Sequence, residues 1–134
     1  MKNTQTVLAA VTDIFFYTKI RDALRAGEYV LERARGQDEV PAKALAHPPA
    51  ALILNMNDEQ LDAFKALDQI KGDARLKAVP VLAFANHEEV DTWRRAKESG
   101  VTKIVSRNEF SSRTKDLIDE VIAAQPHARL ETDG

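Results

Sequence analysis

The chain has 134 residues, of which 44% are hydrophobic and 30% are charged, and this length and composition predict one globular domain. Its 19 basic and 21 acidic residues are spread along the chain and give a net charge of −2. Without a basic stripe to contact phosphates, nucleic acid is not an expected partner. Cysteine is absent, which excludes disulfides and thiolate chemistry, and no apolar stretch has the length of a signal peptide or a bilayer span. We therefore expect a cytoplasmic protein without a membrane partner.

The first third of the chain alternates apolar runs with segments of helical periodicity. Residues 6–11 are a continuous apolar run that predicts a strand, and residues 15–27 follow with apolar side chains at helical spacing. Residues 28–34 alternate weakly, as an edge strand does. Asp38 and Pro41 then indicate the start of a short helix that ends at Ala46.

The remaining elements repeat this alternation. Residues 50–54 and 79–85 predict buried strands. Between them we expect a helix capped by Asn57, with Asp58 and Glu59 in its first turn. Three further segments complete the domain: a helix over residues 90–100, a strand over 101–106 and a single helix over 108–124. We expect the polar residues 125–134 to be a disordered tail after a domain that spans residues 1–124.

Five strands that alternate with five helices predict an α/β protein with a doubly wound parallel sheet and helices on both faces. In such sheets ligands bind outside the carboxyl ends of the strands. The polar or small residues at these ends are therefore the candidates for a site: Thr12, Asp13, Asn55, Asn57, Ala85, Asn86, His87, Ser106, Arg107 and Asn108.

Several segments together resemble a known family. They are VTD at residues 11–13, ALILNMN at 51–57, DARLKAVPVLAF at 73–84, AKESGVTKIV at 96–105 and Arg107. Over residues 5–124 the chain is similar to the CheY-like receiver domain of two-component response regulators. The resemblance implies a flavodoxin-like strand order of 2-1-3-4-5 and a non-enzymatic role in phosphorelay signal transduction.

The chain departs from the receiver pattern at most positions of the phosphoacceptor pocket. The family places two adjacent acids after the first strand, an aspartate after the third, a serine or threonine after the fourth and a lysine after the fifth. Here these positions are Thr12 and Asp13, then Asn55, Ala85 and Arg107. The resemblance therefore implies a degenerate pocket, or pseudo-receiver, in which only Asp13 is unchanged.

These replacements have chemical consequences. An amide such as Asn55 cannot form an acyl phosphate, and Asp13 alone should hold magnesium weakly at best, so we expect no metal and no cofactor. Asn55 is expected to pair with Arg107 or Asp13 and so imitate one state permanently. Two simpler interpretations stay open: Asn55 satisfies local backbone groups, and Asp13 caps the first helix.

Alternatives to an inert pocket also stay open. A small anion held by Arg107 and the strand-end amides, or phosphorylation at a non-standard residue such as Asp58, would keep the domain switchable. Asn86 and His87 are candidates for a switch loop after the fourth strand. In the aromatic cluster of residues 15–17, Phe16 is expected in the core and Phe15 at the mouth of the pocket or against a partner.

We expect a stand-alone signalling protein that acts through contacts with other proteins, such as a histidine kinase or an effector. The resemblance places the contacts on the face formed by the fourth helix, the fifth strand and the last helix. Its candidate residues are Trp93, Lys97, Lys103, Ile104 and Arg113, and a homodimer through this face is possible.

Overall fold

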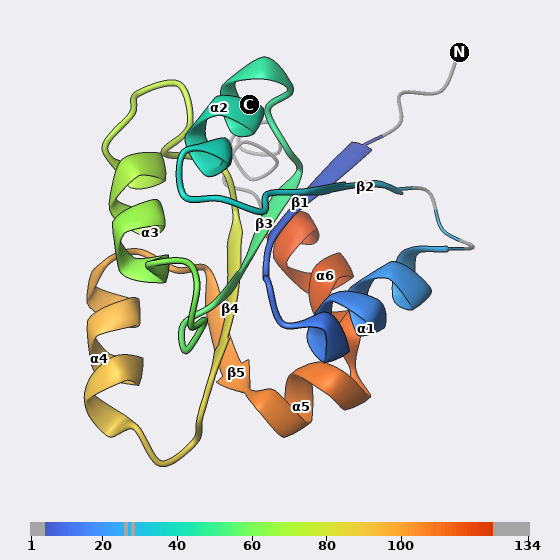
Figure 1. The fold of residues 1–134 in the computed structure, drawn as a ribbon, viewed down its shortest axis with the longest axis vertical. Coiled ribbons are helices and arrows are strands. Elements are labelled where there is room, and N and C mark those ends of the chain that lie inside the picture. Colours follow the sequence, from blue (N-terminus) through green and yellow to red (C-terminus); the bar gives the residue numbers. More distant parts are fainter. Residues whose placement is uncertain (1–4, 26, 28, 125–134) are drawn as a thin grey trace, which may run out of the picture.

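A computed structural model describes residues 5–25, 27 and 29–124 of the chain (Figure 1). Strands and helices alternate in these residues in the order β1 (Gln5–Ala10), α1 (Ile14–Leu24), β2 (Tyr29–Arg33), α2 (Glu39–Ala46), β3 (Ala51–Asn55), α3 (Ala63–Lys71), β4 (Val81–Ala85), α4 (Val90–Glu98), β5 (Lys103–Ser106), α5 (Arg107–Ser112) and α6 (Thr114–Ala123). The five strands pair in parallel in the order β2-β1-β3-β4-β5, which confirms the predicted sheet. The tail predicted over residues 125–134 lies outside the described residues.

Helices cover both faces of the sheet, as the apolar runs of the central strands require (Figure 1). Every residue of β3 and β4 is buried. Successive side chains of a strand point to opposite faces, so Leu8 of β1 joins a core with α2, α3 and α4, whereas Val7 joins a core with α1, α5 and α6. None of the helices in the described residues has the length and apolar character of a bilayer span.

The segment after β3 differs from the prediction. Asn57, Asp58 and Glu59 do not form the first turn of a helix, because α3 begins only at Ala63. The residue that caps α3 is Asp62, whose carboxylate accepts a hydrogen bond from the backbone N–H of Lys65 at 3.0 Å. A loop over residues 56–62 therefore follows β3, at the carboxyl end of the sheet.

The predicted single helix over residues 108–124 is two helices. The first, α5, begins at the end of β5, where the hydroxyl of Ser106 accepts a hydrogen bond from Glu109 N–H at 3.0 Å. Arg113 interrupts the helix with φ −130° and ψ 33°. Phe110 anchors α5 by stacking on Phe84 of β4, with ring centroids 4.2 Å apart.

Candidate functional site

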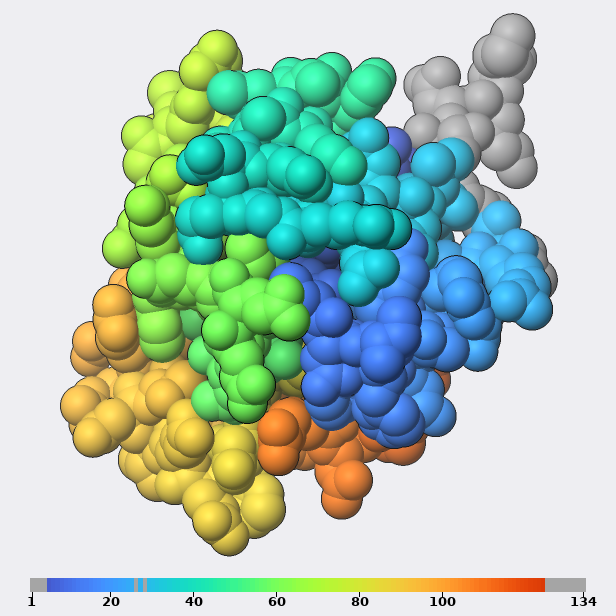
Figure 2. Space-filling model, in the orientation of Figure 1, coloured from blue at the N-terminus to red at the C-terminus, as the bar shows by residue number. Residues whose placement is uncertain are grey.

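The main cavity lies at the carboxyl ends of β1, β3 and β5, where the topology predicts a site. Its volume is about 380 Å³, and it is lined by Thr12, Asp13, Ile14, Asn55, Asn57, Asp58, Glu59, Gln60 and Arg107. In Figure 2 the beginning of α1 in blue, the loop after β3 in green and α5 in orange come together at this end of the molecule. The structure thus brings together all of the predicted pocket residues except Ala85, which is fully buried in β4.

Asp58 is the residue that sequence reasoning placed wrongly. Its carboxylate reaches across the cavity to Thr12, which donates from its backbone N–H to Oδ2 at 2.8 Å and from its hydroxyl to Oδ1 at 2.7 Å. Oδ1 also accepts from the backbone N–H groups of Gln60 and Leu61, each at 2.9 Å. Oδ1 thus accepts three hydrogen bonds and Oδ2 accepts one, so both oxygens of Asp58 are engaged with the backbone and with Thr12. Asp58 therefore acts as a tether between the loops after β1 and β3.

Asn55 makes a local contact instead of the expected pair. It is only 4% exposed, and its Oδ1 accepts a hydrogen bond from the backbone N–H of Asn57 at 2.9 Å. Within the described residues no hydrogen bond joins it to Arg107 or Asp13, and its Nδ2 donates none. The expected pairing is thus wrong, and the amide serves the backbone turn after β3.

Asp13 caps α1. Its Oδ1 accepts from the backbone N–H groups of Phe15 at 2.8 Å and Phe16 at 3.3 Å, which satisfies two donors of the first turn. Phe16 packs in the core as predicted, whereas Phe15 is 56% exposed. Tyr17 lies under the guanidinium of Arg33, whose carbon is 4.1 Å from the ring centroid.

Asn57 joins the loop after β3 to the loop after β4. Its Oδ1 accepts from the backbone N–H of Asn86 at 2.7 Å, and its Nδ2 donates to Oε1 of Glu89 at 2.7 Å. Sequence reasoning placed Asn57 in the pocket but did not identify Glu89, because nothing in the sequence links two loops that lie 32 residues apart.

Arg107 is the cation of the site. It begins α5 and lines both the main cavity and a second one of about 300 Å³ formed with Asn86, His87, Glu88 and Asn108. In the part of the chain that the structure describes, its guanidinium makes no hydrogen bond or ion pair. Of the predicted switch-loop residues, His87 is exposed, with Nε2 3.8 Å from Glu88 Oε2.

The predicted interaction face contains several residues that are already engaged. Ile104 is only 9% exposed, so it belongs to the core and offers little surface. Trp93 is partly buried and donates from its indole N–H to the carbonyl of Asn86 at 3.0 Å. Lys97 is exposed and has no polar partner among the described residues.

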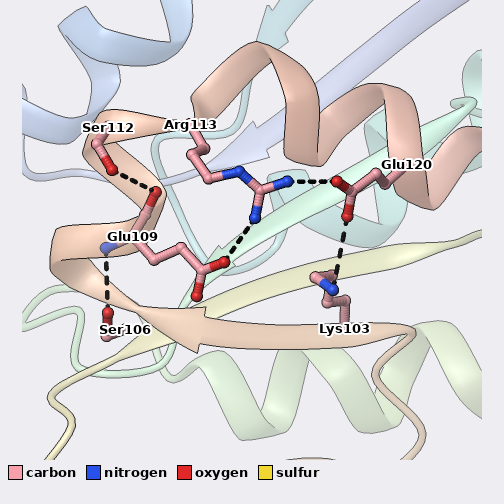
Figure 3. A network of polar contacts seen from close by, with 6 residues as sticks. All are labelled: Lys103, Ser106, Glu109, Ser112, Arg113 and Glu120. Carbon is pink, nitrogen blue, oxygen red and sulfur yellow. Dashed lines mark hydrogen bonds and ion pairs between the residues drawn. The ribbon is translucent and has the colours of Figure 1, made fainter.

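Lys103 and Arg113 belong to one network of ion pairs on this face (Figure 3). Arg113 bonds the carboxylates of Glu109, at 2.7 Å, and Glu120, while Lys103 lies 3.5 Å from Glu120. The hydrogen bonds that Arg113 donates to the carboxylates of Glu109 and Glu120 raise the pKa of its guanidinium. The network joins β5, α5 and α6 across the break at Arg113.

The oxygens of the main cavity do not fit a magnesium site. Oδ1 of Asp58 accepts three hydrogen bonds and Oδ2 one, Oδ1 of Asp13 caps α1, and Oδ1 of Asn55 accepts from the backbone. Magnesium needs near-octahedral oxygen ligands, of which one or two are usually free carboxylates. Within the described residues no group of three or more histidine, cysteine or acidic side chains is arranged to hold a metal ion.

Comparison with solved structures identifies the fold. The phosphorylated cyanobacterial phytochrome response regulator RcpA superposes with a TM-score of 0.74 at 16% identity, over 89% of this chain and 91% of that one. The receiver domain of the sensor histidine kinase PA1611 from Pseudomonas aeruginosa, whose structure holds magnesium in its active-site cleft, superposes with a TM-score of 0.77 at 15% identity, over 91% and 100%. This chain has the receiver fold.

The receiver fold also occurs in longer proteins that match this chain. NtrX from Brucella abortus superposes with a TM-score of 0.83 at 16% identity over 98% of this chain, but the match spans only 29% of NtrX. No family model matches the sequence, and no curated protein does. At these identities the likeness establishes the fold, and function has to be argued from the site.

Proposed function

We propose that this chain is a non-enzymatic signalling domain that acts through contacts with other proteins and does not pass through an aspartyl phosphate. The observation that carries the proposal is Asn55, which occupies the exit of β3 with its Oδ1 bound to the backbone of Asn57. An amide in this place supplies neither the charge nor the basicity of a phosphoacceptor. A histidine kinase or an effector of a two-component system is the proposed partner class.

The neighbours of Asn55 support the same proposal. Ala85 has no hydroxyl that could donate to a phosphoryl group, and Thr12 already donates its hydroxyl and backbone N–H to Asp58. Without a metal-binding set of carboxylates, the charge of an incoming phosphoryl group would be poorly compensated. The surface formed by α4, β5 and α6 is the proposed contact face, with Lys97 and the exposed part of Trp93 available to a partner.

Beryllofluoride, which imitates a phosphoryl group on a carboxylate, tests this proposal. Two-dimensional amide spectra of the 15N-labelled chain should be unchanged by beryllofluoride and magnesium, beyond shifts that the salts alone produce. Asn55→Asp restores the carboxylate without altering size but should also respond weakly, because the metal-binding carboxylates are still missing. A receiver domain with an intact acidic pocket is the positive control. Saturable shifts of the residues around Asn55 in the wild-type chain would overturn the proposal.

A second candidate function is a switch controlled by a small anion, and the unpartnered guanidinium of Arg107 favours it. Phosphate or sulfate bound there should raise the melting temperature of the wild-type chain and not that of Arg107→Ala. Lys97→Ala, which removes an exposed cation away from both cavities, is the control for nonspecific salt effects. Phosphorylation at Asp58 is the weaker alternative, because four hydrogen bonds already use its oxygens.

A further inference from the structure

A continuous series of hydrogen bonds connects the pocket to α4. Asn55 fixes the backbone of Asn57, and the Asn57 side chain in turn binds the loop after β4 at two points, Asn86 and Glu89. The amide of Asn57 is used from both ends, since its oxygen accepts and its nitrogen donates. Rotation of this one side chain would therefore break both contacts at once.

The two anchored residues position the first turn of α4. Glu89 directly precedes the helix, and its Oε1 also accepts from the hydroxyl of Thr92 at 3.1 Å. The carbonyl of Asn86 accepts both from Glu89 N–H, at 3.1 Å, and from the indole of Trp93, at 3.0 Å. Val90, at the start of the same turn, is 70% exposed. The orientation of the Val90 and Trp93 side chains thus depends on where residues 86–89 lie.

We propose that Asn57 is a latch that holds residues 86–89, and with them Trp93 and the first turn of α4, in one fixed arrangement. The latch couples the pocket to the outer surface without a phosphoryl group. This inference rests on the proposed function for its purpose, because a domain without a phosphorylation cycle needs another way to keep its contact face in a defined state. The contacts themselves do not depend on that function, so the latch and the proposed function can fail separately.

The latch makes a specific prediction for hydrogen exchange. The amide of Asn86 donates only to the side chain of Asn57 among the described residues, so its protection should depend on that side chain. A hydrogen bond of this kind contributes about 1 kcal/mol, so Asn57→Ala should speed exchange of the Asn86 amide about fivefold. The same variant should shift the indole N–H resonance of Trp93, which reports the position of the Asn86 carbonyl.

Two further variants separate the two contacts of Asn57, the one with Asn86 and the one with Glu89. Asn57→Asp keeps an acceptor for Asn86 N–H but places a carboxylate against Glu89, so the indole resonance should shift while Asn86 stays more protected than in Asn57→Ala. Glu89→Ala removes only the second contact and keeps the experiment interpretable if Asn57→Ala does not fold. Glu88→Ala is the control and should change neither signal, because the exposed Glu88 side chain makes no hydrogen bond to Asn57, Glu89 or Trp93 among the described residues.

The outcome is decided by the Asn86 amide and the Trp93 indole together. At least a threefold acceleration of exchange in Asn57→Ala, or in its absence an indole shift in Glu89→Ala, supports the latch. Smaller changes, or equal changes in Glu88→Ala, would overturn it. Phosphorylation of the wild-type chain would contradict the proposed function. It would not alter the comparison of Asn86 exchange and Trp93 indole shifts among these variants, so the two failures are distinguishable.

Discussion

Thr12 donates two hydrogen bonds to one carboxylate, that of Asp58, through its backbone N–H at 2.8 Å and its hydroxyl at 2.7 Å. The contact spans 46 residues of sequence and closes the loop after β1 onto the loop after β3. Thr12 stands where the receiver pattern has an acid, and the side chain of an ionised acid could not donate to Asp58. The change at position 12 and the acid at position 58 therefore act as a pair.

The hydroxyl of Thr12 should contribute measurably to stability. Thr12→Val keeps the size and the branched shape but leaves Asp58 without one donor, so we expect the free energy of unfolding in urea to fall by about 1–2 kcal/mol. Thr18→Val is the matched control, because the hydroxyl of Thr18 in α1 makes no hydrogen bond among the described residues. Equal losses in the two variants would show that the contact with Asp58 contributes nothing.

Restoring the acid of the receiver pattern at position 12 should be harmful by itself. Thr12→Asp places two carboxylates together and removes the hydroxyl donor, so we expect a loss of about 1–3 kcal/mol in the free energy of unfolding. Asp58→Asn in the same chain should recover part of that loss, since the charge repulsion disappears. A double-mutant cycle measures this coupling, and strictly additive effects would rule out the pairing of positions 12 and 58.

A contact far from the pocket gives the stability a pH dependence. Hydrogen bonds from Lys115 and from the hydroxyl of Tyr29 lower the pKa of Asp119 below its ordinary range. A carboxylate with a lowered folded-state pKa stabilises the fold above its unfolded pKa, near pH 4, and loses that contribution as the pH falls through the folded pKa.

Asp119→Asn should therefore destabilise the protein at pH 6 and much less at pH 3. Because the carboxylate is partly exposed, we expect only about 0.5–1 kcal/mol at the higher pH. Asp116→Asn, an exposed acid of the same helix, is the control. Urea unfolding of each variant at both pH values provides the measurement, and a difference between wild type and Asp119→Asn that stays constant with pH would contradict the assignment.

The ion-pair network of Figure 3 changes how the predicted contact face should be tested. Lys103→Glu would set a carboxylate against Glu120 and disturb the domain itself, whereas Lys97→Glu alters a charge with no partner in the described residues. If two copies of the chain pair through this face, Lys97→Glu should weaken their association at low salt. We expect about 0–1 kcal/mol for each ion pair that Lys97 makes with the second copy. Sedimentation at two salt concentrations measures this effect, and a wild-type chain that stays monomeric at high concentration would remove the homodimer.

The sequence predicted the sheet well because β3 and β4 are short, fully apolar runs between clear helical patterns. It did not predict the break at Arg113, since neither proline nor glycine marks that position and the apolar spacing continues through it. The pocket residues followed from topology alone, but their hydrogen bonds did not. Whether Asn55 binds Arg107 or its own turn depends on distances that are fixed only once the loop after β3 has folded.

Intact-mass measurement after incubation with acetyl phosphate and magnesium tests the central claim most directly. The wild-type chain should keep its unmodified mass, because the amide of Asn55 cannot accept a phosphoryl group and Asp58 is held by Thr12. A receiver domain with an intact acidic pocket, treated in parallel, shows that the reagent is active. A hydroxylamine-labile adduct with the mass of one phosphoryl group on the wild-type chain would contradict the account.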